Sequence, residues 1–518
     1  MSRAGMNPLY KRLLAGVALI PVLALAGCGT SQPAPKENVA AAAPKGQKSV
    51  TIAINGDPPT LNPNFDGATI SGWVDSNIFD ALLQRNKEGK LEPSLATEWQ
   101  NPQPDTWNFT LRQNVKFQNG DALTADDVVY SIQRILNPDN KSPRRGDFVW
   151  ITDVKKTDDT HIQIKTKGAY PAALERLSGL DIVPKAYYEK VGAEGFAKEP
   201  VGTGPFKFVS YQHGQQINLE ANSSYWRGQP AIDKVLFRII PEAATQLNEL
   251  KSGGVDVVPN VAPDQIPSLK SQPNLQIATT PTLRTVMMPM DNHTKPFNDI
   301  RVRQAFNYAV DKDAIIKNIE QGLGTPEAGI LPSMVAGNNP ALKPYPYDPN
   351  KAKQLRAEAG YGSGLSVDMN VAGSMRDGAQ IADAIRGYLD AVGVKLNLHV
   401  YQTIAPYLAL WPDKAGPVAL TSWGGGFDGD FYYTATVKTG NTYSIFNDPK
   451  LDAIIDQANA TADPAAHTKL WQQAEQYLYD QAGWVFLWSN NTAYGLTKRV
   501  TWAPRVDEGI WVYEMKVN

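Results

Sequence analysis

The stretch Trp107–Leu136 reads WNFTLRQNVKFQNGDALTADDVVYSIQRIL. At its start, apolar side chains alternate with polar ones, at Trp107, Phe109 and Leu111. A period of two is typical of a half-buried β-strand. The alternation resumes at Val115–Phe117, and two such runs close together predict a β-hairpin.

A turn and a helix are predicted to follow this hairpin. Asn119-Gly120 favours a turn because both residue types tolerate a positive φ. Thr124 and Asp127 have the spacing of a capping box, which satisfies free backbone donors at a helix start. The apolar residues beyond them fall on one helical face, at Val128, Ile132, Ile135 and Leu136. Asn137-Pro138 is predicted to end the helix.

The amino-acid sequence of this region closely resembles the signature of the family 5 solute-binding proteins. The similarity runs from Leu95 to Leu136 and follows L-R-x-x-V-K-F-x-[DN]-G-x-x-L/F-T-A-x-D-V-x-Y-S. Further segments resemble the family in the same order along the chain, at 201–241, 296–312 and 347–361. Members of this family are oligopeptide- and dipeptide-type receptors of bacterial ABC importers.

The resemblance implies an α/β, two-lobed periplasmic-binding-protein fold of type II, with the ligand cleft between the lobes. An extra subdomain, at 84–195, is expected within lobe one. Lobe one itself would comprise 49–83, 196–286 and 489–518, and lobe two would comprise 287–488. The length of 518 residues agrees with more than one domain.

The N-terminal residues predict export and lipid anchoring. Residues 1–27 resemble a signal peptide, in which Lys11 and Arg12 precede the apolar run Leu13–Ala26. Leu25-Ala26-Gly27-Cys28 resembles a lipobox, so Cys28 is expected to be acylated; an ordinary signal peptide with an accidental cysteine is the alternative. Residues 28–48 have the composition of a flexible tether. The mature protein would therefore lie in the periplasm or at the cell surface, held to the membrane through Cys28.

Several other functional classes lack support in the sequence. The net charge is −2 and no basic stripe is present, so nucleic acid is not an expected partner. The five histidines do not have the spacing of metal ligands, and we predict that each lies on the surface or packs in the core. No catalytic motif is found, so we predict no catalytic residues, no metal and no cofactor.

The segment Thr421–Tyr433, TSWGGGFDGDFYY, is the richest candidate for ligand contact. It combines an aromatic stacking face, glycines that allow close backbone approach and carboxylate acceptors, at Trp423, Gly425, Gly426, Asp428 and Asp430. The alternative without a binding role is a solvent-exposed turn between two secondary-structure elements. A secreted hydrolase with Asp428 and Asp430 as paired carboxylates is an alternative from another functional class.

In the family, a W-x-x-D segment at this place lines the cleft, and its aspartate commonly binds the α-amine of a peptide. Here the third residue after Trp423 is Gly426. Asp428 could bind the α-amine of the peptide in place of that aspartate, or Gly426 could make room for a bulkier solute. The departure puts peptide specificity in doubt and leaves the receptor assignment unchanged.

Two residues outside this segment are also predicted to contact the ligand. Trp488 would form part of the cleft wall, although core packing is the common fate of a tryptophan. Arg284 directly precedes an expected crossing strand, Thr285–Asn292, and could bind a ligand carboxylate. A surface arginine is the alternative.

The resemblance implies a monomeric receptor that closes on a small solute by a hinge and delivers it to ABC permease subunits in the membrane. A di- or oligopeptide is the preferred ligand. An opine, a glutathione-like compound, an oligosaccharide and a nickel complex are the alternatives within the same role.

Overall fold

The structure, a computed structural model, describes residues 48–373, 375–411 and 416–518. The predicted signal peptide, Cys28 and nearly all of the tether lie outside the described residues. Within the described part, no helix combines the length and apolar character that crossing a membrane requires.

An eleven-stranded mixed sheet forms the backbone of the fold, in the order β15-β14-β16-β12-β17-β11-β1-β10-β9-β8, with β13 beside β17. Its strands are β1 (Ser49–Ile54), β8 (Phe206–Gln212), β9 (Gln216–Ala221), β10 (Lys234–Ile239), β11 (Val257–Val258), β12 (Leu275–Pro289), β13 (Gly324–Pro326), β14 (Leu365–Ala372), β15 (Val394–Tyr401), β16 (Val418–Gly424) and β17 (Trp484–Thr497).

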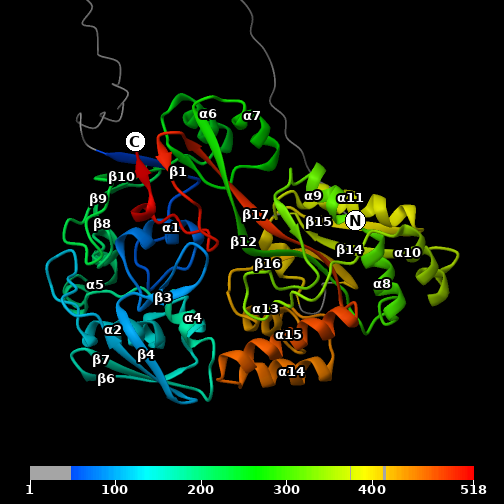
Figure 1. Cartoon of the computed structure of the whole chain (residues 1–518), viewed down its shortest axis with the longest axis horizontal. Helices are drawn as coiled ribbons and strands as arrows, with labels where there is room; N and C mark the ends of the chain where they lie inside the picture. Colours follow the sequence, from blue (N-terminus) through cyan, green and yellow to red (C-terminus); the bar gives the residue numbers. More distant parts are fainter. Residues whose placement is uncertain (1–47, 374, 412–415) are drawn as a thin grey trace, which may run out of the picture. The chain divides into compact units, whose positions relative to one another are not determined.

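The long antiparallel strands β12 and β17 connect the two ends of this sheet (Figure 1, green and red). Val286 pairs with Trp488, so the predicted lobe boundaries after 286 and 488 meet at one point of the ladder. The register shifts on both sides of this point, between Pro281 and Thr285 and between Val286 and Met287. Such irregularities bend a strand pair locally. β12 begins well before the predicted Thr285, and Arg284 therefore lies inside the strand.

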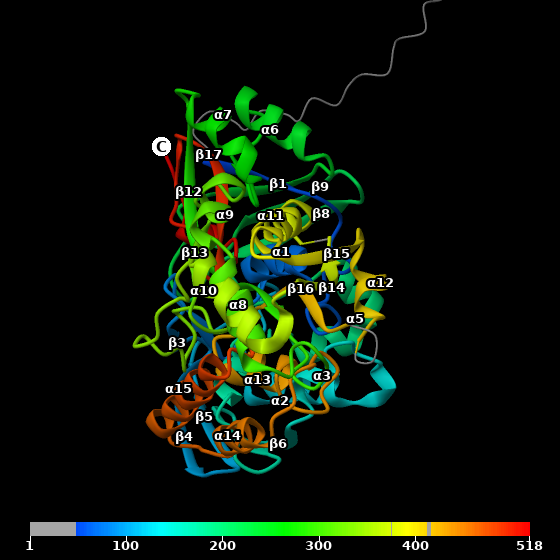
Figure 2. The same cartoon turned by 90° about the vertical axis from the view of Figure 1, so that its right-hand side faces the viewer.

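Separate hydrophobic cores lie at the two ends of the sheet. At one end, α1 (Thr69–Ile78) packs its apolar residues with those of β1 and β10. At the other end, β14–β16 share a core with α8 (Ile300–Ala309) and α11 (Gly378–Ala391). Figure 2 shows α8, α10 (Pro349–Arg356) and α11 alongside these strands.

A smaller four-stranded sheet, ordered β4-β5-β7-β6, contains the alternating residues Trp107, Phe109 and Leu111 on β5. β5 (Thr106–Leu111) pairs with β4 (Ala96–Gln103) and β7 (His161–Thr166), and β6 (Ile151–Asp158) pairs with β7. The predicted hairpin with Val115–Phe117 is therefore wrong. Asn114 has a φ of +62° and turns the chain away from the sheet edge, which β7 occupies instead.

The predicted helix is confirmed as α2 (Ala125–Leu136). The carboxylate of Asp127 accepts the backbone N–H of Thr124 at 2.9 Å, as the capping box requires. Val128, Ile132 and Ile135 are buried beneath the sheet's apolar face.

The remaining elements connect these parts. They are β2 (Leu83–Arg85), β3 (Leu91–Pro93), α3 (Arg145–Phe148), α4 (Ala173–Leu177), α5 (Lys185–Lys198), α6 (Ala243–Ser252), α7 (Ile266–Lys270), α9 (Lys312–Asn318), α12 (Ile404–Leu408), α13 (Gly429–Thr436), α14 (Pro449–Asn459), α15 (Pro464–Asp480), β18 (Val500–Thr501) and β19 (Lys516–Val517).

Candidate ligand-binding site

A cavity of about 600 Å³ lies among segments that are far apart in the sequence. Its lining comes from 66–85, 144–148, 172–181, 425–431 and 505–511, together with Ser94. These segments belong to the predicted lobe one, its subdomain, lobe two and the C-terminal return to lobe one. The volume lies within the range of sites that enclose small molecules.

The loop after β16 brings four of the predicted residues to this cavity. Gly425, Gly426, Asp428 and Asp430 all line it. Gly425 has a φ of +130°, a conformation that L side chains rarely adopt, and it lets the chain turn from the strand towards α13.

Gly426 packs directly against a neighbouring aromatic residue. A Cβ atom at position 426 would lie 2.6 Å from the Cβ atom of Phe431. The space on the Cβ side of the glycine is therefore filled by Phe431, and room for a bulkier solute beside Gly426 stays a prediction.

Both carboxylate oxygens of Asp428 already have partners. Oδ1 accepts the backbone N–H of Asp430 at 2.9 Å and caps α13. Oδ2 lies 2.8 Å from Nε2 of His467, whose Nδ1 lies 2.9 Å from the carbonyl oxygen of Ala458. The Trp471 indole N–H also points at Nε2, at 3.0 Å, so this ring nitrogen lies between Asp428 and Trp471. Each oxygen keeps a second lone pair, so an amine would share the carboxylate with Asp430 and His467.

His467 is the buried partner of this carboxylate, and only 5% of the residue is exposed. Burial lowers the pKa of His467, but the hydrogen bond and charge of Asp428, the Ala458 carbonyl and the charge of Asp430 together raise it by more, so the net shift is upward. The prediction of a surface or packing histidine missed this pairing, because the two residues lie far apart in sequence.

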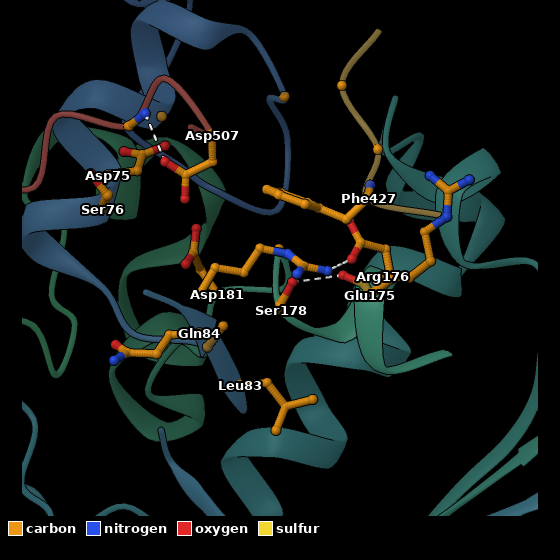
Figure 3. Close-up of a pocket in the computed structure, with 18 of the residues that line it drawn as sticks. Asp75, Ser76, Leu83, Gln84, Glu175, Arg176, Ser178, Asp181, Phe427 and Asp507 are labelled. Atoms are coloured by element: carbon orange, nitrogen blue, oxygen red, sulfur yellow. Dashed lines mark hydrogen bonds and ion pairs between the residues drawn. The ribbon is translucent and has the colours of Figure 1, made fainter. Parts of the chain in front are cut away.

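The loop after β16 also touches the opposite wall of the cavity. The Phe427 N–H donates to Oε1 of Glu175 at 3.3 Å, and the Arg85 guanidinium lies 3.7 Å from the Phe427 ring centroid. Arg85 and Glu175 form an ion pair. Burial lowers the pKa of Arg85 to about 10 although Asp507 and Asp428 act in the opposite direction. Figure 3 shows Phe427 close to Glu175.

Acidic side chains outnumber arginines along the described lining, and no lysine is among these residues. Asp75 on α1 and Asp181 both point into the cavity (Figure 3). Sequence reasoning missed these two carboxylates. Neither belongs to a recognisable motif, and only the fold brings them together.

The other predicted contact residues lie elsewhere. Trp423 and Arg284 line a second cavity of about 270 Å³ together with Tyr407 and Trp411. Phe431 lines both cavities, so the second adjoins the first.

Trp488 is fully buried, and its indole N–H donates to Asn490 at 3.2 Å. β17 is covered on both faces at this point, so the side chain packs in the core and does not line either cavity. The structure thus corrects its assignment to the cleft wall.

Among the residues that the structure describes, no cluster of three or more His, Cys, Asp or Glu side chains has an arrangement that would hold a metal ion.

The profile of the bacterial extracellular solute-binding proteins, family 5 (middle), matches residues 90–444. The chain belongs to this family. The chain is 30% identical over 510 residues to "Heme-binding protein A" of Haemophilus influenzae, across 89% of this chain and 91% of that protein. It is 29% identical over 472 residues to the "Dipeptide-binding protein" of Escherichia coli, across 84% and 88% of the two chains.

A solved structure carries the same fold. The ABC transporter-associated periplasmic binding protein DppA of Helicobacter pylori, in complex with the peptide STSA, aligns with a TM-score of 0.72 and 25% identity, over 90% of this chain and 98% of that one. The family 5 receptor therefore has the type II periplasmic-binding-protein fold with two lobes, as the sequence implied.

Proposed function

We propose that this family 5 receptor captures a peptide in the cavity of about 600 Å³ and delivers it to the permease subunits of an ABC importer. The observation that carries the proposal is the origin of the lining, which comes from both predicted lobes. A solute bound there would contact both lobes at once, so its binding would favour a closed form. The relatives named for a dipeptide and solved with a peptide support this ligand class.

Gly425, Gly426, Asp428 and Asp430 would face the solute from lobe two. The hinge would lie where the paired strands β12 and β17 pass from one lobe to the other, at the lobe boundaries after 286 and 488. The receptor would act as a monomer and release its ligand unchanged. A hydrolase is disfavoured because the carboxylate of Asp428 is committed to His467 and that of Asp430 to the Thr434 hydroxyl.

Isothermal titration calorimetry with di- and tripeptides tests the peptide proposal. We expect one-to-one binding of at least one peptide, with the peptide recovered unchanged. A ligand that binds only the folded state should also raise the melting temperature with concentration. Binding of an opine, a glutathione-like compound, an oligosaccharide or a nickel complex in place of every peptide would contradict the peptide ligand and retain the receptor role. Steady consumption of the ligand would contradict that role.

We also propose that the chain is exported and anchored through acyl groups on Cys28. Cys28→Ala should yield an unprocessed or released protein, because multi-chain lipidation is needed for a stable hold on the membrane. Fractionation with mass measurement of the processed chain checks this. Equal membrane retention of wild type and variant, with identical processed masses, would contradict the anchor.

A further inference from the structure

Three carboxylates of the cavity, those of Asp66, Asp75 and Asp181, lie close enough to act on one another where α1 faces the segment around Asp181. Asp75 is only 4% exposed, yet its side chain has no hydrogen bond or ion pair with any residue that the structure describes. Buried carboxylates normally have such partners. Asp75 lines the cavity and points into it (Figure 3), so its carboxylate is available to a group bound in the cavity.

A second buried carboxylate in the same cavity shows the contrast. Asp80 is 7% exposed and accepts hydrogen bonds from Thr203 at 2.8 Å, Tyr225 at 3.0 Å and Trp226 at 3.0 Å. The protein thus supplies a full set of donors where a carboxylate is structural. It supplies none to Asp75.

Other charges around Asp75 leave an excess of negative charge. Asp66 and Asp181 both lie close enough to act on it, and the side chain of Asp181 also lacks a hydrogen bond within the described chain. Arg144 is the nearby cation, but its guanidinium donates to the carbonyl oxygens of Pro63 at 3.0 Å and Gly179 at 2.6 Å. One arginine therefore faces three carboxylates.

The pKa shifts of Asp75 and Asp181 agree with a site whose negative charge is not balanced by nearby cations. Burial raises the pKa of Asp75 well above its usual value, and the charges of Asp181 and Asp66 raise it further against the opposing effect of Arg144. Burial raises the pKa of Asp181 to about 6, with Arg144 opposing and Asp80 adding to the shift. A bound cation would favour the ionised form of both groups.

We propose that the cavity recognises an organic cation, a primary ammonium or guanidinium group of the solute, through Asp75 and Asp181 on lobe one. The proposal rests on the solute-binding function proposed above and defines the ligand's charge. A metal ion fits less well, since the described carboxylates do not form a metal-binding cluster. The cation would thus be held on lobe one and not by the loop after β16, where the third residue after Trp423 is Gly426.

Calorimetry with three probes tests the proposal: the tripeptide Ala-Lys-Ala, N-acetyl-Ala-norleucine-Ala, which carries no cation, and agmatine, a non-peptide cation. The variants are Asp75→Asn and Asp181→Asn. Asp153→Asn, an exposed position on β6 that removes the same charge, is the matched control. We expect Ala-Lys-Ala to bind at least about tenfold more tightly than the uncharged peptide, in the wild type and in the control. Either cavity variant should reduce this preference to less than about threefold.

The probes separate the cation inference from the peptide proposal. Binding of agmatine but of neither peptide, with the same dependence on Asp75 and Asp181, supports the inference and contradicts a peptide ligand. Equal binding of charged and uncharged peptides supports the peptide ligand and overturns the inference. Absence of binding by both cationic probes at millimolar concentration also overturns it.

Stability of the ligand-free protein gives a second readout. Asp75→Asn should raise the melting temperature at pH 8, because it removes an unpartnered buried charge. Asp80→Asn should lower it, because it disrupts a satisfied set of hydrogen bonds. A lower melting temperature for Asp75→Asn, with unchanged affinity for the cationic probes, would assign Asp75 a structural role and overturn the inference.

Discussion

At the residue scale, the loop after β16 shows how local packing shapes a wall of the cavity. The sequence located this loop, and Gly425, Gly426, Asp428 and Asp430 do line the cavity. Sequence could not show that Phe431 fills the space beside Gly426, because that contact depends on how the chain turns into α13. For the same reason it could not show that Asp428 is paired with His467 across the core.

Gly426→Asp, which restores the aspartate of the related motif, should therefore destabilise the protein. Its Cβ atom would meet that of Phe431 at 2.6 Å, and overpacking of this kind costs about 1–3 kcal/mol. Phe431→Ala in the same chain should recover part of the loss. Thermal or urea denaturation measures the effect, with Gly146→Ala as the control because a Cβ atom there would meet nothing within 4 Å. An equally stable Gly426→Asp variant would contradict the packing at this position.

Asp428→Asn should reduce stability by about 1–3 kcal/mol at pH 5.5 and by less at pH 9. The folded pKa of His467 is raised above its ordinary value near 6.5, so the stabilisation by Asp428 is present below that value. It is lost as the pH rises through the folded pKa. Urea denaturation at the two pH values measures the difference.

The matched control for this pair is Asp463→Asn, which changes another aspartate N-cap, that of α15, without a histidine partner. Its small effect should not change with pH in this range. A loss for Asp428→Asn that is independent of pH would contradict the charged Asp428–His467 pair.

At the scale of helices and strands, sequence patterns predicted the features that depend on interactions between residues close together in the chain. The capping box and the apolar face of α2 involve residues within a few positions of one another, and the structure confirms both. The partner of β5 is instead set by strands distant in sequence, and the predicted hairpin was wrong. Likewise, the apolar run of β17 predicted a strand but did not show that both faces of the strand are covered. Because both faces are covered, Trp488 is buried in the core and does not line the cavity.

Asp127 links α2 to the start of α5, and its replacement should cost more than a surface change. Its Oδ2 accepts the N–H of Thr124 and its Oδ1 accepts the N–H of Lys185, each at 2.9 Å. Asp127→Ala leaves both donors without a partner, and we expect a loss of about 2–4 kcal/mol in the free energy of unfolding. Asp126→Ala on the same helix removes only an exposed ion pair with Lys156 and should cost clearly less. Equal losses in urea denaturation would contradict the double role of Asp127.

At the scale of the whole molecule, the family signature predicted the type II fold, because it spans segments that the fold arranges in a fixed order. It did not predict Asp75 and Asp181 as cavity residues, because these carboxylates come together only when α1 packs beside the subdomain. The cavity's charge is therefore a property of the assembled fold and not of any one motif.

Small-angle X-ray scattering tests closure of the two lobes. If the solute contacts both lobes, a saturating ligand found by calorimetry should reduce the radius of gyration, because the hinge at β12 and β17 brings the lobes together. The ligand-free protein and a non-binding analogue of the ligand are the controls. Binding without any change in the scattering curve would contradict hinge closure.

The most direct test of the receptor function is native mass spectrometry of the protein purified without refolding. Capture of a solute in the cavity predicts one non-covalent ligand per chain, released intact on denaturation and lost from the Asp75→Asn, Asp181→Asn double variant. Conversion of the bound compound during incubation would contradict the receptor function, whereas equal retention of an intact solute by the double variant would contradict only the role of Asp75 and Asp181.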